Sequence, residues 1–397
     1  MKLKRLLPIL LFLYAFNVNA QQDKNTFEIF GFVMADVLYN INTVDPLWYD
    51  GLRPTKLPSY DGEFAPNGKI VFSVRQTRFG VKSSTQTPLG ELKTKFDFDL
   101  YGTGSNAGLT TFRVRDVYGQ LGRFLAGKTN SAFMDPDVYP NLYESWGPPG
   151  IVFSRNIQIK YKPLMDKNND LAIALENPGG SADEGIYANR IELTSVKPHL
   201  QLPDLTAHYR YSDDWGYIQV GGILGSLKWE DINDTAKYKL SGSAVRWGTL
   251  LSSSIYFGKS AVLRLMGVYG EGIENYVNDA PADVGPQKNP GNTVSPVSGV
   301  ALPIAGVVCF LDINWSKMFK STIGYSANKV SNSDGQVPSA YKMGQYAVVN
   351  FLYYPVDNFM AGIEFLYARR DNYNGYFSDN PQVHLTFKYD FSKVFEF

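Results

Sequence analysis

Hydrophobic and polar residues alternate with a period of two along many stretches of this chain. The clearest stretch is ELKTKFDFDLY, residues 91–101, in which Leu92, Phe96 and Phe98 alternate with charged positions. A period of two is typical of a β-strand, whose successive side chains point to opposite faces. A strand with one apolar and one charged face fits a soluble sandwich, or an outer-membrane barrel with lipid outside and water inside.

The same pattern recurs along the whole chain and predicts about sixteen strands, an even number, as in bacterial single-chain barrels. The predicted strands are 27–39, 70–83, 89–101, 110–121, 123–129, 155–162, 170–176, 204–212, 217–228, 245–257, 260–270, 304–315, 319–330, 342–354, 358–369 and 381–391. The aromatic-rich pattern over 383–391 resembles the signal read by the barrel assembly machinery, and a short tail, 392–397, follows it.

The connections between these strands alternate in length. Short ones lie at 87–88, 122–123, 213–216, 258–259, 316–317 and 355–357, and long ones at 40–69, 130–154, 177–203 and 271–303. Outer-membrane barrels combine short periplasmic turns with long external loops, whereas a sandwich has no reason to sort its loops in this way. The chain is therefore predicted to be all-β: a transmembrane antiparallel β-barrel.

The first residues have the features of a secretory signal peptide. A basic start precedes an apolar run, Leu6 to Phe16, and a small-residue site that ends at Ala20. We expect cleavage after residue 20, which makes 1–20 the signal peptide and 21–397 the barrel. Such a chain would reside in the outer membrane of a Gram-negative bacterium, in contact with its lipid.

Composition narrows the function further. The 38 basic and 38 acidic residues balance, which argues against a nucleic-acid partner. Aromatic residues make up 14% of the chain, which suits strands and interfacial girdles. The three histidines lie in no recognisable catalytic pattern, and the chain has no clear metal motif, so we predict no enzyme activity, cofactor or metal. A barrel hydrolase and a surface adhesin remain as alternatives.

Basic residues gather on the early strands. A charge in the lipid band costs about 2–4 kcal/mol at mid-depth, so these side chains should point into the lumen, where guanidinium groups can bind carboxylates with two prongs. The alternative is that they are ordinary lumen residues paired with Glu91, Asp97 and Asp99. The predicted basic wall consists of Arg75, Arg78, Arg113, Arg115, Lys128 and Arg155.

A long loop follows the fifth predicted strand. Prolines stiffen it and aromatic residues give it bulk, so residues 133–150 are predicted to fold inward as a constriction that faces the basic wall. The alternative is an external loop packed on a neighbouring subunit. The predicted constriction residues are Asp135, Asp137, Tyr139, Tyr143, Glu144 and Trp146.

Two runs, TRFGVKSSTQTPLGELKTKFDFDLYG and FRVRDVYGQLGRFLAGKTNSAFMD, resemble the DcaP-like trimeric porins of Gram-negative outer membranes, as do LPDLTAHYRYSDDWGYIQVGG and YGEGIENYVND. The resemblance implies a sixteen-stranded homotrimer that takes up small anionic solutes, with dicarboxylates as the family's substrates. It also places the same basic residues on the wall and 133–150 in the constriction.

The chain departs from the family pattern in two ways. Some members carry a coiled coil before the barrel, whereas only 21–26 precede the first strand here, so a trimer would rely on barrel contacts. Lys128 replaces a common arginine, which weakens two-pronged recognition. The sequence predicts a passive diffusion channel for small, anionic, carboxylate-type solutes, with a nonselective general porin as the alternative.

Overall fold

A computed structural model describes residues 25–233 and 237–397. The predicted signal peptide, 1–20, lies outside these residues. The described helices are single 3-10 turns of three residues each, and none is long and apolar enough to cross a membrane.

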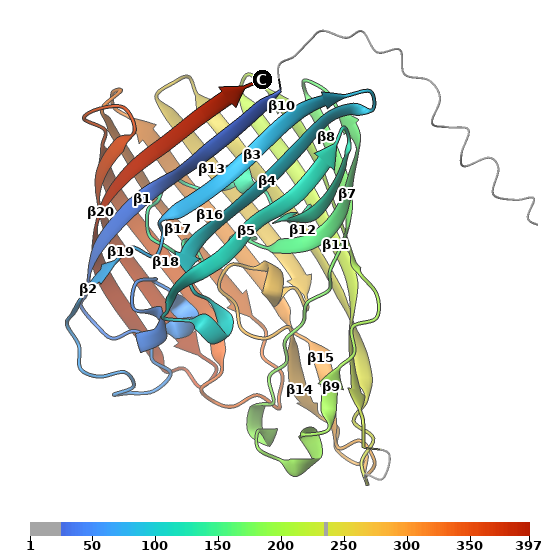
Figure 1. The fold of residues 1–397 in the computed structure, drawn as a ribbon. Helices are drawn as coiled ribbons and strands as arrows, with labels where there is room; N and C mark the ends of the chain where they lie inside the picture. The colour runs from blue at the N-terminus through green and yellow to red at the C-terminus, as the bar shows by residue number, and fades with distance from the viewer. Residues whose placement is uncertain (1–24, 234–236) are drawn as a thin grey trace, which may run out of the picture.

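A closed wall of sixteen antiparallel strands forms the molecule, because β2 and β3 count as one strand interrupted at 74–77 (Figure 1). β1 pairs with both β3 and β20, and this double pairing closes the ring. The wall consists of β1 (Thr26–Asn40), β2 (Lys69–Ser73), β3 (Arg78–Thr87), β4 (Gly90–Tyr101), β5 (Thr110–Leu121), β6 (Phe124–Asn130), β7 (Arg155–Met165), β8 (Asn169–Glu176), β10 (Asp204–Asp213), β11 (Gly216–Asp231), β12 (Gly242–Phe257), β13 (Ala261–Glu271), β16 (Pro303–Asn314), β17 (Phe319–Val330), β18 (Tyr341–Tyr353), β19 (Phe359–Asn372) and β20 (Phe377–Glu396).

Three further strands lie outside the ring. β9 (Val196–Pro198) pairs with the end of β11, and β14 (Val284–Lys288) pairs with β15 (Val297–Ala301) as a hairpin in a long loop. The short turns gather at the end where β20 finishes, and the long loops gather at the opposite end (Figure 1). The predicted strand number and the predicted sorting of the loops are therefore confirmed.

The wall strands keep the alternation from which they were predicted. On β4, Phe96 is 42% exposed on the outer face, whereas its neighbour Asp97 is 1% exposed and points inward. Cys309 on β16 is likewise exposed in an outer row. Apolar rows therefore face the membrane around the ring.

The predicted tail after 391 is wrong, because β20 continues to Glu396. Residues 392–396 pair with 26–30 on β1, in register with the rest of that ladder. Without this extension, the first residues of β1 would lack a partner on one side, and unpaired backbone groups are costly in lipid. The stretch 110–129 is two strands, β5 and β6, joined by a tight turn that Gly122 makes with a φ of 54°.

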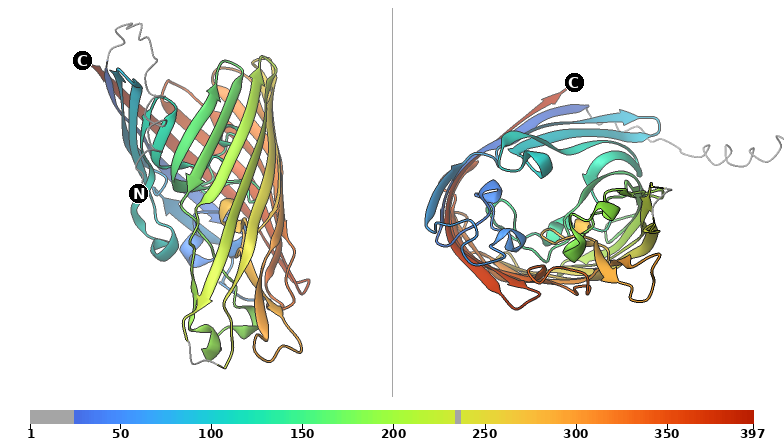
Figure 2. Two further views of the ribbon diagram at one scale, coloured as in Figure 1. Left: turned by 90° about the vertical axis from the view of Figure 1, so that its right-hand side faces the viewer. Right: turned by 90° about the horizontal axis from the view of Figure 1, so that it is seen from below.

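The loop between β6 and β7, residues 131–154, lies inside the ring of strands and is called the inner loop below. Its apolar residues Phe133, Ile151 and Val152 are fully buried in one cluster with inward side chains of the wall. This packing explains the long apolar run over 300–311, because β16 faces lipid on one side and this cluster on the other. Seen along the barrel, loop segments fill part of the interior (Figure 2).

Candidate functional site

The inner loop is bound to the wall near its beginning. Asp135 is fully buried and caps the 3-10 turn η5 (Pro136–Val138) by accepting from the N–H of Asp137 at 3.0 Å. Its other oxygen accepts from the Tyr217 hydroxyl at 2.8 Å, and Arg210 of β10 makes ion pairs with both Asp135 and Asp137. This end of the loop is therefore fixed to the β10–β12 side of the barrel.

Glu144 organises the far end of the inner loop. Its buried carboxylate accepts from the backbone N–H groups of Leu52 at 2.8 Å, Trp146 at 3.0 Å and Gly147 at 2.5 Å. Burial raises the pKa of Glu144 to about 7, although the three N–H donors act in the opposite direction. Glu144 thus links the inner loop to the long loop 41–68 and titrates near neutral pH.

An aromatic cluster stiffens the same junction. The Trp146 ring meets Trp48 edge to face, with ring centroids 4.7 Å apart, and its indole N–H donates to the carbonyl of Asn278. The guanidinium of Arg53 lies 4.0 Å from the centroids of both tryptophan rings. Contacts of this kind stabilise loops that have little regular hydrogen bonding of their own.

A cavity of about 260 Å³ lies between the inner loop and the strands β3–β7. Arg113 and Arg115 reach it from β5, and both are tied to Asp99 of β4. Arg113 donates to Asp99 with two prongs at 2.9 and 2.7 Å, and Arg115 donates at 2.7 Å. The other guanidinium groups that line the cavity belong to Arg78 and Arg155.

Arg78 and Arg155 differ from the other two arginines in what they bind. Within 25–233 and 237–397, the Arg78 side chain makes no hydrogen bond or ion pair, and it lies over the Phe32 ring at 5.2 Å. Among the same residues, Arg155 makes one long ion pair, with its Nε 3.7 Å from Asp116, and its guanidinium lies 4.7 Å from the centroid of the Phe153 ring. Their Nε atoms are buried without a hydrogen-bond partner, and their terminal N–H groups make no hydrogen bond within the described residues, so the terminal groups are the ones left for a solute in the cavity.

Arg75 does not belong to this wall. It is fully buried, pairs with Asp50 at 2.7 Å and donates to the carbonyl of Gly102 at 2.9 Å. The interruption at 74–77 breaks the alternation between Arg75 and the next strand, so the side chain turns toward the loop 41–68 instead. The prediction that Arg75 belongs to the basic wall of the lumen is therefore wrong.

Lys128 does not line the cavity either. The ladder places it opposite Val117 of β5 and Ile157 of β7, and both of those side chains face outward. Directly paired residues share a face, so Lys128 belongs to the outer row. Its ammonium donates to the carbonyl of Val114 at 3.1 Å.

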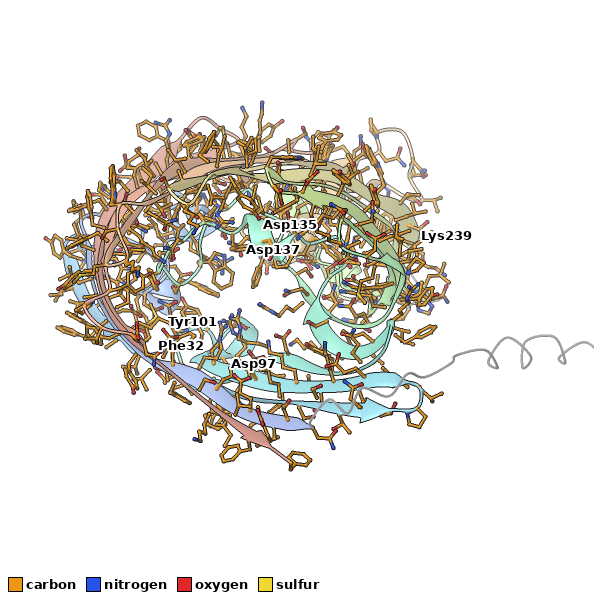
Figure 3. All side chains as sticks on the ribbon, turned by 90° about the horizontal axis from the view of Figure 1, so that it is seen from above. Phe32, Asp97, Tyr101, Asp135, Asp137 and Lys239 are labelled. Carbon is orange, nitrogen blue, oxygen red and sulfur yellow. The ribbon has the colours of Figure 1, made fainter. Side chains whose placement is uncertain are left out.

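The predicted constriction residues of the inner loop lie in three places. Glu144, Tyr139 and Trp146 line the cavity with the arginines, whereas Asp135 and Asp137 lie across the lumen from Asp97 and Tyr101 (Figure 3). Tyr143 contacts the far wall, where its hydroxyl lies 2.9 Å from that of Tyr354.

Asp137 lines a second cavity, of about 460 Å³, together with Arg210 and Arg264. Sequence reasoning missed both arginines as site residues. Arg210 stands in the polar row of the strand 204–211, and Arg264 is a single charge in an apolar run, so each had a detectable inward signal.

Among the described residues, no group of three or more His, Cys, Asp or Glu side chains is arranged to hold a metal ion.

The family model named DcaP outer membrane protein matches residues 23–265, which is more than half of the chain. The chain belongs to the DcaP outer membrane protein family. No curated protein matches this DcaP-family chain. This membership and the closed ring of strands make the protein an outer-membrane barrel protein.

Solved structures share the fold. The outer membrane channel DcaP of Acinetobacter baumannii matches at 20% identity with a TM-score of 0.76, covering 95% of this chain and 99% of that one. The anion-selective porin of Comamonas acidovorans matches at 8% identity and a TM-score of 0.59, covering 93% and 100%. OmpT of Vibrio cholerae matches at 12% identity and a TM-score of 0.56, covering 94% and 99%.

Proposed function

We propose that this DcaP-family porin is a passive channel that favours small anionic solutes, with carboxylates as the solute class. The observation that carries the proposal is the cavity beside the inner loop, where Arg78 and Arg155 face the open space with hydrogen-bonding capacity left over. A carboxylate that enters exchanges its water for these donors, which lowers its barrier to passage.

The charge balance of the cavity supports the same choice. Four guanidinium groups line it against two carboxyl groups, Asp99 and Glu144. Asp99 is already bonded to Arg113 and Arg115, and Glu144 is close to its pKa near neutral pH. The remaining positive charge concentrates anions beside the inner loop. We propose residues 133–150 as the constriction and dicarboxylates as the preferred solutes.

The planar-bilayer reversal potential under a salt gradient tests this proposal. Wild-type channels should be anion-selective, and the double variant Arg78→Gln/Arg155→Gln should lose that selectivity several-fold while the barrel still shows heat-modifiable gel mobility. Arg369→Gln is the matched control, because Arg369 pairs with Asp371 away from the cavity. A wild-type channel without ion preference would support the nonselective porin and overturn the proposal.

We also propose that three copies associate. OmpT of Vibrio cholerae, a structural neighbour with a TM-score of 0.55, is described in a trimer form. Lys128 in the outer row supports an interface there, since a charge facing lipid at mid-depth costs about 2–4 kcal/mol. Light scattering in detergent should give the mass of a trimer, and Lys128→Glu should shift it toward the monomer.

Maturation also remains a proposal. We propose that cleavage after residue 20 removes the signal peptide, that the barrel assembly machinery inserts the chain, and that the outer rows then contact outer-membrane lipid. The intact mass of the protein purified from outer membranes tests the cleavage. A mass that includes residues 1–20 would contradict it.

A further inference from the structure

A buried histidine bridges two carboxylates on the neighbouring wall strands β19, β20 and β1, next to β3 and its Arg78. His384 of β20 is 1% exposed, and its Nε2 lies 2.9 Å from an oxygen of Asp36 on β1. Its Nδ1 lies 3.5 Å from an oxygen of Glu364, which stands directly opposite it on β19. The three side chains share the inward rows of three adjacent strands.

The two carboxylates of this bridge reach the same residue of the inner loop, Tyr143, Glu364 directly and Asp36 through Gln76. Glu364 accepts from the backbone N–H of Tyr143 at 2.9 Å. Asp36 accepts at 3.1 Å from the side-chain amide of Gln76, and that same amide donates to the carbonyl of Tyr143 at 2.8 Å. The N–H of Tyr143 is therefore linked to His384 through Glu364. The carbonyl of Tyr143 is linked to His384 through Gln76 and Asp36.

The electrostatics of the bridge require a cation at its centre. Two carboxylates buried this close together repel each other, and a buried charge without a partner is strongly destabilising. An imidazolium can donate from both ring nitrogens, so it can face both carboxylates and also carries a positive charge. A neutral amide side chain carries no such charge. Asn350 donates to one oxygen of Glu364 at 3.0 Å and Thr386 donates to Asp36 at 2.6 Å, whereas within the described residues the other oxygen of Glu364 has no hydrogen-bond donor and faces His384.

We propose that His384 is a positioning residue for the channel: it keeps Asp36 and Glu364 in place, and they hold the Tyr143 end of the inner loop against the wall. The width of the arginine cavity, which this loop borders, thus depends on a histidine that no solute touches. The inference rests on the proposed constriction. The inference is tested by the frequency of closures in single-channel recordings. The proposed function is tested separately, by ion selectivity.

Single-channel recording of His384→Gln tests the bridge. Glutamine keeps a donor but not the charge, so the two acids repel and the loop leaves its place, with closures and conductance steps about tenfold more frequent than in wild type. His199→Gln, in the long loop 177–203, is the control and should behave as wild type.

The double variant His384→Gln/Glu364→Gln distinguishes charge from packing. It restores the charge balance of the bridge, and the amide oxygen at 364 can still accept from Tyr143, so closures should return to within about threefold of wild type. A quiet His384→Gln channel would overturn the proposal. So would a double variant as unsteady as the single one, because the imidazole would then act through its shape alone.

A second variant covers the case in which His384→Gln does not fold. Gln76→Leu removes the link between Asp36 and the Tyr143 carbonyl without adding a buried charge, and it should increase closures by a smaller factor. Wild-type steadiness in a folded Gln76→Leu channel would contradict the proposed route. In every folded variant the sign of the reversal potential should stay that of wild type, because Arg78 and Arg155 are untouched.

Discussion

Among the arginines that face the lumen, Arg210 and Arg264 on one side and Arg78 and Arg155 on the other have opposite relations to their surroundings. Arg210 donates to Gln219 at 2.9 Å and pairs with two aspartates of the inner loop, and Arg264 pairs with Asp312 at 2.6 Å and donates to the backbone of the loop. Arg78 and Arg155 have almost no such partners. The residue type and the inward direction are the same.

The position of the acidic side chains, rather than that of the arginines, therefore decides which arginines are structural and which are free to bind a solute. Where the inner loop brings aspartates to the wall, the guanidinium groups become anchors. Where the loop brings Tyr139 and Trp146 instead, the guanidinium groups remain open to solutes.

Removing an anchoring arginine should have the largest effect. Arg210→Gln leaves the buried Asp135 without its cation, and breaking a buried pair in this way costs about 3–5 kcal/mol. The temperature at which the heat-modifiable gel band converts should fall by many degrees, and the channel should become unsteady. An unchanged conversion temperature would mean that this arginine is no anchor.

Removing an open arginine should change transport and spare the fold. Arg78→Gln deletes a cation that has no carboxylate partner among the described residues, so the conversion temperature should stay within a few degrees of wild type or rise. Anion selectivity, measured as a reversal potential, should fall. A large loss of stability in this variant would show that Arg78 is also structural and would remove the contrast.

The pH dependence of selectivity should follow Glu144. Burial raises its pKa from 4.5 to about 7, so the folded protein binds a proton here that the unfolded chain has released. Its contribution to stability is therefore full below pH 4.5 and is lost as the pH rises to about 7. As the pH falls from about 8 to 6, the cavity loses a negative charge and anion selectivity should increase.

Glu144→Gln provides the control for this pH effect. The amide oxygen can still accept from the N–H groups of Leu52 and Trp146, the bond from the Gly147 N–H is lost, and the side chain no longer titrates. The reversal potential of the variant should be nearly flat over that pH range and close to the acidic wild-type value. A variant with the full wild-type pH dependence would assign the titration to another group.

The smallest effect is expected at a surface pair. Arg369 and Asp371 lie 2.7 Å apart at the long-loop end, with side chains 33% and 22% exposed. Such pairs contribute about 0–1 kcal/mol, so Arg369→Gln should leave both the conversion temperature and the selectivity near wild type. A strong effect of Arg369→Gln would mean that removing any charge of the barrel changes stability or selectivity. The comparison of anchoring and open arginines would then be contradicted.

The wall could be predicted from the sequence because alternation is a local signal. Each strand records its own two faces, as β4 does in the order of its phenylalanines and aspartates. The count of strands and the sorting of the loops follow from the same local information.

The partners of the inward charges could not be predicted in this way. Arg210 and Asp135 are separated by 75 positions, and their pairing depends on where the inner loop crosses the lumen. Arg75 was misplaced by a break between two strands, and Lys128 by the side of the ladder to which it belongs. A shift of one residue in a strand reverses every side chain, so single charges near strand ends are the least secure part of such a prediction.

The seam between β1 and β20 has a kinetic consequence. Fifteen consecutive pairs, from Thr26 with Glu396 to Asn40 with Gln382, join residues more than 340 positions apart. Contacts this distant along the chain form slowly, because a very large loop must close before any bond is gained. Until then, both strands expose unpaired edges that invite association with other chains. We expect ring closure to limit the rate of folding, and a slow late phase in the gel-mobility shift to report it.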